Sequence, residues 1–150
     1  MLDTGDQFPA FTLHDQDGNT VTQADLLGSP AVVYFYPKDD TSGCTVEACE
    51  FRDRLTEIPG AKVFGVSPDP VKSHKKFAEK FGLNFPLLAD VEKELCNACG
   101  VWVKKSMYGK EYMGVERTTF VLDPQGAVAA VFRKVKPAGH AAEVMASLPG

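Results

Sequence analysis

The chain has 150 residues, of which 44% are hydrophobic and 24% are charged, and its formal net charge is -4. This size and composition predict one globular domain over residues 1–150, with enough chain for a substantial core. The acidic balance argues against nucleic acid as a partner, and no apolar run reaches the length of a membrane span.

The N-terminal residues 1–7 contain neither the basic segment nor the apolar segment of a secretory signal, so we expect a cytoplasmic protein. In a reducing compartment, cysteines are expected to be catalytic, metal-binding or simply buried rather than joined in permanent disulfides. The chain has four, and their positions must decide between these roles. They are Cys44, Cys49, Cys96 and Cys99.

The first elements predict an N-terminal β-hairpin extension. Apolar residues at 8–13 and 20–21 flank residues 14–19, which are rich in the turn formers Asp, Gly and Asn. A short helix is expected at 23–27. The absence of repeats and of Pro/Gly-rich linkers in the rest of the sequence supports one α/β domain.

The central part of the chain predicts a β-α-β crossover. Its elements are a strand at 31–36, a helix at 45–55, a strand at 61–66 and a helix at 71–81. Asp69 and Pro70 form a good N-cap and first-turn pair for the last of these helices, and Gly82 is expected to end it.

The C-terminal part predicts two further strands that pair antiparallel, joined by the turn at 123–126. Asp90 is expected to cap a helix that Gly100 ends. The elements are a strand at 85–88, a helix at 91–99, a loop at 104–114, strands at 115–122 and 127–132, and a helix at 139–148. Together these elements predict a central mixed sheet flanked by helices.

Cys44 follows the expected strand at 31–36 and stands at the start of the next helix. Free backbone N–H groups and the helix dipole favour a thiolate at such a place. A free cysteine has a pKa near 8.5, so complete ionisation at pH 7 raises the thiolate population only about thirtyfold, or about 2 kcal/mol. A fast reaction therefore also needs fixed donors and a cation that hold the electrophile and stabilise its leaving group.

The neighbouring residues can supply those groups. The Thr41 hydroxyl can turn toward the sulfur or a substrate, the amides of Gly43 and Cys44 can point into the same place, and Pro37 can wall the pocket without adding a donor. Arg117, at the end of a predicted strand, can supply a permanent charge. Taken singly, Thr41 could instead cap the helix, Pro37 end the strand and Arg117 form a surface ion pair.

With these residues the sequence resembles a peroxiredoxin of the peroxiredoxin Q, or bacterioferritin comigratory protein, subgroup. Pro37, Thr41 and Cys44 fit the Pro-x-x-x-Thr-x-x-Cys motif of the family, and Arg117 fits its active-site arginine. The likeness covers nearly the whole chain. Its clearest stretches are residues 43–53, 66–69, 73–77, 85–90, 100–102 and 117–123.

The resemblance implies a thioredoxin-like fold and the reduction of hydrogen peroxide and organic hydroperoxides by a thiol, without a metal or organic prosthetic group. Cys44 would attack the peroxide and become a sulfenic acid, and Cys49 would resolve it to a disulfide that thioredoxin or a similar dithiol reduces. Thr41, Gly43 and Arg117 would bind the substrate. An intramolecular resolving cysteine also favours a monomer.

The spacing of this cysteine pair raises a geometric problem. Residues five apart in a regular helix have Cα atoms about 8.6 Å apart and about 140° around the axis, whereas a disulfide needs about 4.4 to 6.8 Å. The helix that carries Cys44 and Cys49 must therefore unwind locally when the disulfide forms.

Cys96 and Cys99 form a Cys-x-x-Cys pair, which is typical of redox sites. The pair lacks the proline and glycine expected between its cysteines, and Leu95, Cys99 and Trp102 recur at helical spacing, which favours core packing. A secondary redox pair remains the alternative.

Two other functions fit parts of the sequence. A general thiol-disulfide oxidoreductase would use the same Cys44, and a zinc module would use all four cysteines, although 46 residues separate the two pairs. The accessory role expected for Glu47 is to order Arg117 or to favour the helix dipole. The histidines at 14, 74 and 140 are expected to be solvated or to cap helices, and Phe85, Trp102 and residues 107–112 to shape the pocket rim.

Overall fold

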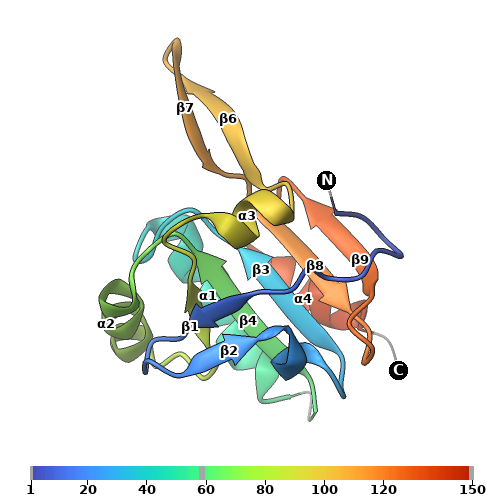
Figure 1. Ribbon diagram of the computed structural model, residues 1–150. Helices are drawn as coiled ribbons and strands as arrows, with labels where there is room; N and C mark the ends of the chain where they lie inside the picture. The colour runs from blue at the N-terminus through green and yellow to red at the C-terminus, as the bar shows by residue number, and fades with distance from the viewer. Residues whose placement is uncertain (1, 58–59, 149–150) are drawn as a thin grey trace.

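The computed structural model describes residues 2–57 and 60–148 and is built around a five-stranded mixed sheet of order β5-β4-β3-β8-β9 (Figure 1). The strands are β3 (Ala31–Phe35), β4 (Lys62–Ser67), β5 (Leu87–Ala89), β8 (Thr118–Leu122) and β9 (Val128–Arg133). β3, β4 and β5 run parallel, β8 is antiparallel to β3, and β9 is antiparallel to β8. The expected crossover and the expected antiparallel pair are both present.

The two central strands, β3 and β8, are buried along their whole length, as their continuous apolar sequences predict for strands covered on both faces. Because successive side chains point to opposite faces, β3 contributes to two separate cores. Val33 and Phe35 belong to one core, while Val32 and Tyr34 belong to the other.

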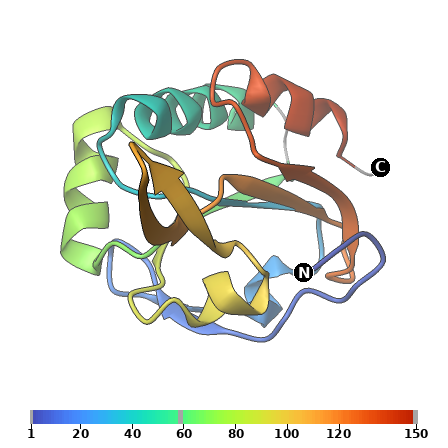
Figure 2. The same ribbon diagram turned by 90° about the horizontal axis from the view of Figure 1, so that it is seen from above.

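Helices cover both faces of the sheet (Figure 2). One face packs against α1 (Ser42–Leu55), α2 (Val71–Phe81) and α4 (His140–Ala146). The other face packs against α3 (Glu94–Ala98) and the N-terminal segment. The N-terminal segment contains β1 (Thr12–His14), β2 (Thr20–Thr22) and the short 3-10 helix η1 (Gln23–Leu26). β1 and β2 pair antiparallel, so the expected N-terminal hairpin is present.

The expected loop at 104–114 is wrong, because this segment forms a second hairpin. β6 (Trp102–Met107) pairs antiparallel with β7 (Lys110–Val115), and the pair projects from the body of the molecule (Figure 1). Tyr108 and Gly109 both have positive φ, 52° and 77°, as a tight two-residue hairpin turn requires. Its largely exposed, charged strands lack the apolar alternation by which a buried strand is recognised.

The helix ends agree with the prediction only in part, since α3 begins at Glu94 with Lys93 as its N-cap and not directly after Asp90. Gly82 ends α2 in the left-handed conformation at φ 60°, and the Asp90 carboxylate accepts hydrogen bonds from the amides of Leu95 and Cys96 in α3. Asp69 does not cap α2, whose N-cap is Pro70. The Asp69 carboxylate instead accepts bonds from the Ser67 hydroxyl and from the Asp39 amide.

Within the described residues, the helices are all too short or too polar to cross a membrane.

Candidate active site

Cys44 lies in the first turn of α1 and is only 1% exposed. The strand β3 leads through residues 36–41 to Thr41, which has an extended backbone and precedes the helix, and the first helical bond runs from the Thr45 amide to the Thr41 carbonyl. The helix thus begins three residues earlier than the sequence pattern predicted. As a result, the Gly43 and Cys44 amides lie among the first-turn groups that lack an intrahelical partner.

Arg117 lies between a sulfur and a carboxylate. Its Nη2 donates to Cys44 Sγ at 3.0 Å, and its Nη1 lies 3.3 Å from Glu47 Oε1. Arg117 stands just before β8, the neighbour of β3, so the antiparallel pairing of these strands brings residues 44 and 117 together. The structure therefore places the permanent positive charge of Arg117 beside the Cys44 thiol.

Glu47 is nearly fully enclosed, with its side chain 1% exposed. Burial raises the pKa of this carboxyl from 4.5 to about 7, an effect that the charge and hydrogen bond of Arg117 oppose and the charge of Glu50 adds to. The expected contact with Arg117 is present. The raised pKa means that near neutral pH the guanidinium faces a carboxyl that is partly protonated.

Gly43 allows Arg117 to reach the sulfur. A Cβ atom at this position would lie 3.0 Å from Arg117 Nη2 and 3.3 Å from Pro137 Cγ. Pro137, in the loop before α4, is a wall of the site that sequence reasoning missed, because no local motif links it to a cysteine more than ninety residues earlier.

Thr41 and Pro37 both lie in the loop between β3 and α1 and are half-buried. The Thr41 hydroxyl donates to the Lys38 carbonyl at 3.0 Å and makes no capping bond to the helix. Its hydroxyl is therefore held by its own loop, with the oxygen lone pairs left to accept a bond.

Cys49 is half-buried on the same continuous helix as Cys44, and both are free thiols. The regular helix between them keeps the two sulfurs apart, so the geometric problem posed by their spacing applies to this reduced form.

Cys96 and Cys99 are completely buried and lie in the other core, on the opposite face of the sheet from Cys44. Burial, together with the negative charge of Asp90, raises the pKa of the Cys99 thiol to about 12 and moves that of Cys96 further in the same direction. The four cysteines do not converge, so this geometry gives no support to a four-cysteine zinc site.

Two of the three histidines correct the sequence expectation. His74 is fully buried, with Nδ1 2.7 Å from Asp39 Oδ2, and His140 is 4% exposed, with Nε2 2.7 Å from the Thr119 hydroxyl. Burial lowers the pKa of His140. Only His14 is exposed as expected. Lysines surround His74 in the sequence of α2, but the His74 side chain itself is buried in the core.

The predicted rim residues separate in the structure. Phe85 packs in the same core as Cys44, whereas Trp102 packs against the other core and under the ammonium of Lys93. Lys105, on β6, was not anticipated. Its pKa is lowered by burial and by the positive charge of Arg117, which places a second cation near the site.

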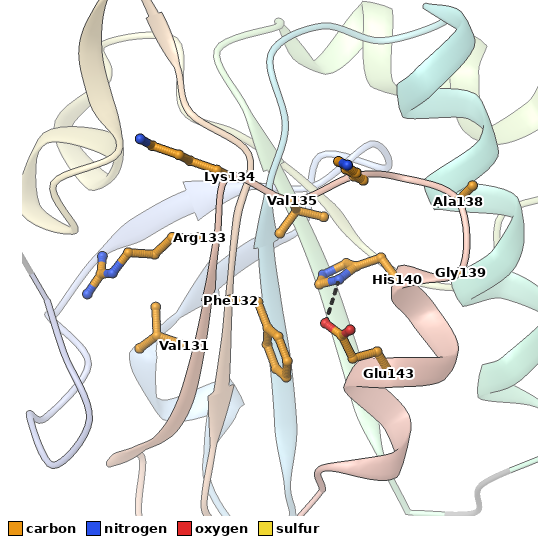
Figure 3. Close-up of a pocket in the computed structure, with 10 residues that line it drawn as sticks. Val131, Phe132, Arg133, Lys134, Val135, Ala138, Gly139, His140 and Glu143 are labelled. Atoms are coloured by element: carbon orange, nitrogen blue, oxygen red, sulfur yellow. Dashed lines mark ion pairs between the residues drawn. The ribbon is translucent and has the colours of Figure 1, made fainter.

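A pocket of about 610 Å³ lies between the end of β9 and α4 (Figure 3). Its lining includes Lys134, Lys136, His140 and Glu143, and the His140 imidazole faces the Glu143 carboxylate at 3.8 Å. None of the predicted site residues lines it, so this pocket is not the predicted thiol site.

Comparison with known proteins agrees with the arrangement around Cys44. Residues 4–131 match the model of the AhpC/TSA family. The chain belongs to this family. A putative peroxiredoxin bcp of Coxiella burnetii is 46% identical over 149 residues, which are 98% of this chain and 99% of the relative. Peroxiredoxin Bcp of Bacillus subtilis is 45% identical over 149 residues, covering 98% and 95% of the two chains. The protein is thus a peroxiredoxin, a thiol-dependent peroxidase.

Solved peroxiredoxin structures share its fold. A cysteine-to-serine mutant of Xylella fastidiosa PrxQ superimposes with a TM-score of 0.92 at 37% identity, covering 97% of this chain and 94% of that one. The Xanthomonas campestris bacterioferritin comigratory protein, described with alkyl peroxide reduction activity, gives 0.87 at 46% identity over 91% and 88%. These similarities confirm the subgroup resemblance and the thioredoxin-like fold.

Proposed function

We propose that Cys44 is the peroxidatic cysteine of this peroxiredoxin and that it reduces hydrogen peroxide and organic hydroperoxides. The observation that carries the proposal is the 3.0 Å contact from Arg117 Nη2 to Cys44 Sγ. A guanidinium cannot lose its proton in this pH range, so it stabilises negative charge on the sulfur before attack and on the peroxide during attack.

The chemistry follows from the groups around the sulfur. The Cys44 thiolate attacks one peroxide oxygen, an S–O bond forms as the O–O bond breaks, and the sulfur is oxidised by two electrons to a sulfenic acid. The second oxygen leaves and takes up a proton, giving water or an alcohol. We assign Thr41, Gly43 and Arg117 to substrate binding, because hydroxyl, amide and guanidinium groups can hold both oxygens in line.

Pro37 lies in the same loop, and we assign it to the wall of the pocket because it offers no amide donor. We assign Glu47 an accessory role, which is to hold the guanidinium of Arg117 in place through the 3.3 Å contact. No step of this reaction uses a metal or an organic cofactor.

Cys49 is proposed as the resolving cysteine, which condenses with the sulfenic acid, releases water and leaves a Cys44–Cys49 disulfide. An external dithiol, thioredoxin or a similar protein, then reduces the disulfide. Both cysteines belong to one chain, which supports a monomer. We also propose that residues 1–150 form a single domain and that the protein is cytoplasmic.

Stopped-flow measurement of peroxide consumption with thioredoxin present tests these assignments. We expect Cys44→Ser to lose activity and Cys49→Ser to consume about one equivalent of peroxide and then stop. Full activity in Cys44→Ser would contradict the proposal. Full turnover in Cys49→Ser would instead assign resolution to Cys96 or Cys99.

A further inference from the structure

Asp39 is a buried carboxylate in the loop that joins β3 to α1, with its side chain only 4% exposed. It accepts hydrogen bonds from the Tyr36 hydroxyl at 2.6 Å and the Ser73 hydroxyl at 2.8 Å, and it lies 2.7 Å from His74 Nδ1. Ser73 and His74 belong to α2, so these bonds join the loop to the helix that follows β4 in the chain.

The partners of His74 determine where its protons lie. Nε2 lies 3.0 Å from the Leu88 carbonyl, which can only accept, so this nitrogen carries a proton. The short Nδ1 to Asp39 contact needs a second proton between the two atoms. Together with the two hydroxyls that donate to Asp39, this contact gives the Asp39 side chain three hydrogen bonds.

The loop held in this way is strained. Asp40 has a φ of 56°, in the left-handed region, which is less favourable than the right-handed region for a residue with a side chain, although aspartate tolerates it better than most. The Asp39 amide donates to Asp69 Oδ2 at 2.8 Å, which adds a fourth, partly buried tie. The tie from Asp40 to Lys80 is solvent-exposed and adds little.

The anchored loop is continuous with the thiol site at both ends. Tyr36 stacks on Tyr34 at 5.4 Å between ring centroids, and Tyr34 stacks on Phe51 of α1 at 4.8 Å. Cys44 packs in the same core as these rings. The position of the loop that leads to Cys44 is thus set from α2 as well as from β3 and α1.

We propose that Asp39 and His74 are positioning residues for peroxide reduction, because they clamp the loop that carries Pro37 and Thr41 and leads into the first turn of α1, where Cys44 lies. This inference rests on the proposed function of those residues. The Asp39–His74 pair affects how the peroxide is held in the site. The contact between Arg117 and Cys44 does not depend on this pair.

Two reactions of Cys44 separate these effects. Oxidation by hydrogen peroxide needs both the thiolate and a substrate held in line, whereas alkylation by iodoacetamide needs the thiolate and access alone. In a Cys49→Ser background, residues 39–52 lie between two trypsin cleavage sites and contain Cys44 as their one cysteine, so mass spectrometry follows both reactions there.

In this background we expect Asp39→Ala to slow peroxide oxidation at least about tenfold and to change alkylation less than about twofold. Asp39→Asn should restore the peroxide rate to within about threefold, since an amide can accept from Tyr36 and donate to a neutral His74. Lys80→Gln, which cuts the exposed tie to the same loop, is the control and should change neither rate.

A folded Asp39→Ala protein with an unchanged peroxide rate would overturn the inference, as would equal loss of both rates or failure of Asp39→Asn to restore the rate. If Asp39→Ala does not fold, Ser73→Ala decides, with an expected peroxide-specific loss of about fivefold for one hydrogen bond. An unchanged ratio of the two rates in Ser73→Ala would overturn the inference. Peroxide consumption that persists in Cys44→Ser would instead refute the proposed function.

Discussion

The Arg117 guanidinium contacts both the Cys44 thiol and the Glu47 carboxyl. Protonation of the buried carboxyl therefore changes the electrostatic environment of the sulfur. The two terminal nitrogens of Arg117 make these contacts, and Gly43 gives the space for this approach. Small changes at these residues should therefore affect reactivity more than folding.

Replacing Gly43 by alanine should displace the guanidinium from the sulfur, because the new Cβ would lie 3.0 Å from Arg117 Nη2. We expect the rate of peroxide oxidation to fall about ten- to a hundredfold. The free energy of unfolding should change by less than about 1 kcal/mol, since alanine favours the helix. A peroxide rate equal to that of the wild type would contradict this account, and Ser42→Ala, on the exposed neighbour, is the control.

The raised pKa of Glu47 should appear in the pH dependence of stability. The native carboxyl holds its proton up to about pH 7, while the unfolded one releases it near 4.5, so the native state binds more protons in this interval and stability falls as pH rises. From pH 4.5 to 8, the free energy of unfolding should fall by up to about 3 kcal/mol relative to Glu47→Gln. Urea unfolding of both proteins measures this, and parallel pH profiles would refute it.

At the scale of elements, α1 carries out two opposed tasks. Its regular first turn places Cys44 beside Arg117, yet the same regularity keeps Cys44 and Cys49 too far apart for a disulfide. The proposed Cys44–Cys49 disulfide therefore requires this end of the helix to open and close.

Hydrogen exchange should reveal that opening. In the disulfide form, amides at 42–50 should exchange faster than in the reduced form, because local unwinding breaks their helical bonds. The amides of α2 provide the internal control, since this helix contains neither cysteine. Identical exchange at 42–50 in the two redox states would show that the helix does not unwind.

The parallel pair β3 and β4 depends on a glycine. A Cβ atom at Gly65 would lie 2.9 Å from Leu87 Cδ2 and 3.0 Å from the Tyr34 ring, both fully buried. Gly65→Ala should therefore lower the free energy of unfolding by about 1 to 3 kcal/mol through overpacking.

The matched control is Gly114→Ala, in β7. Its Cβ would lie 3.3 Å from the flexible Lys105 side chain, which can move away. Urea unfolding should give it a loss smaller by at least about 1 kcal/mol. Equal losses for the two variants would rule out core crowding as the cause.

At the scale of the whole molecule, the sheet divides the cysteines between two cores. Cys44 packs with α1 and α4, while Cys96 and Cys99 pack with α3 and the N-terminal segment. The sheet lies between the two groups, so Cys44 does not contact Cys96 or Cys99.

Replacing Cys96 and Cys99 together by alanine should therefore lower the free energy of unfolding by about 2 kcal/mol and leave peroxide turnover with thioredoxin unchanged. Chemical unfolding and steady-state peroxide consumption measure the two effects. Loss of turnover in a folded double variant would assign this pair a redox role.

The sequence predicted most elements of the fold because their signals are local. The ends of α2, the buried strands and the turn at 123–126 follow from apolar periodicity, glycine and proline. Predictions failed where a side chain or segment depends on a distant partner. Asp69 binds the Asp39 loop instead of capping α2, and the second hairpin was missed because its strands face solvent.

The sequence alone determined the subgroup resemblance, the thiol chemistry and the candidate residues in the motif around Cys44, because these lie within one short stretch of chain. Tertiary structure alone decided which distant groups meet the sulfur and which cysteines are separated from it. Strand pairing carries Arg117 to Cys44, and the burial of His74 ties α2 to the loop through Asp39. The physical reason is that such contacts depend on sheet register and packing across the whole chain, which local patterns do not encode.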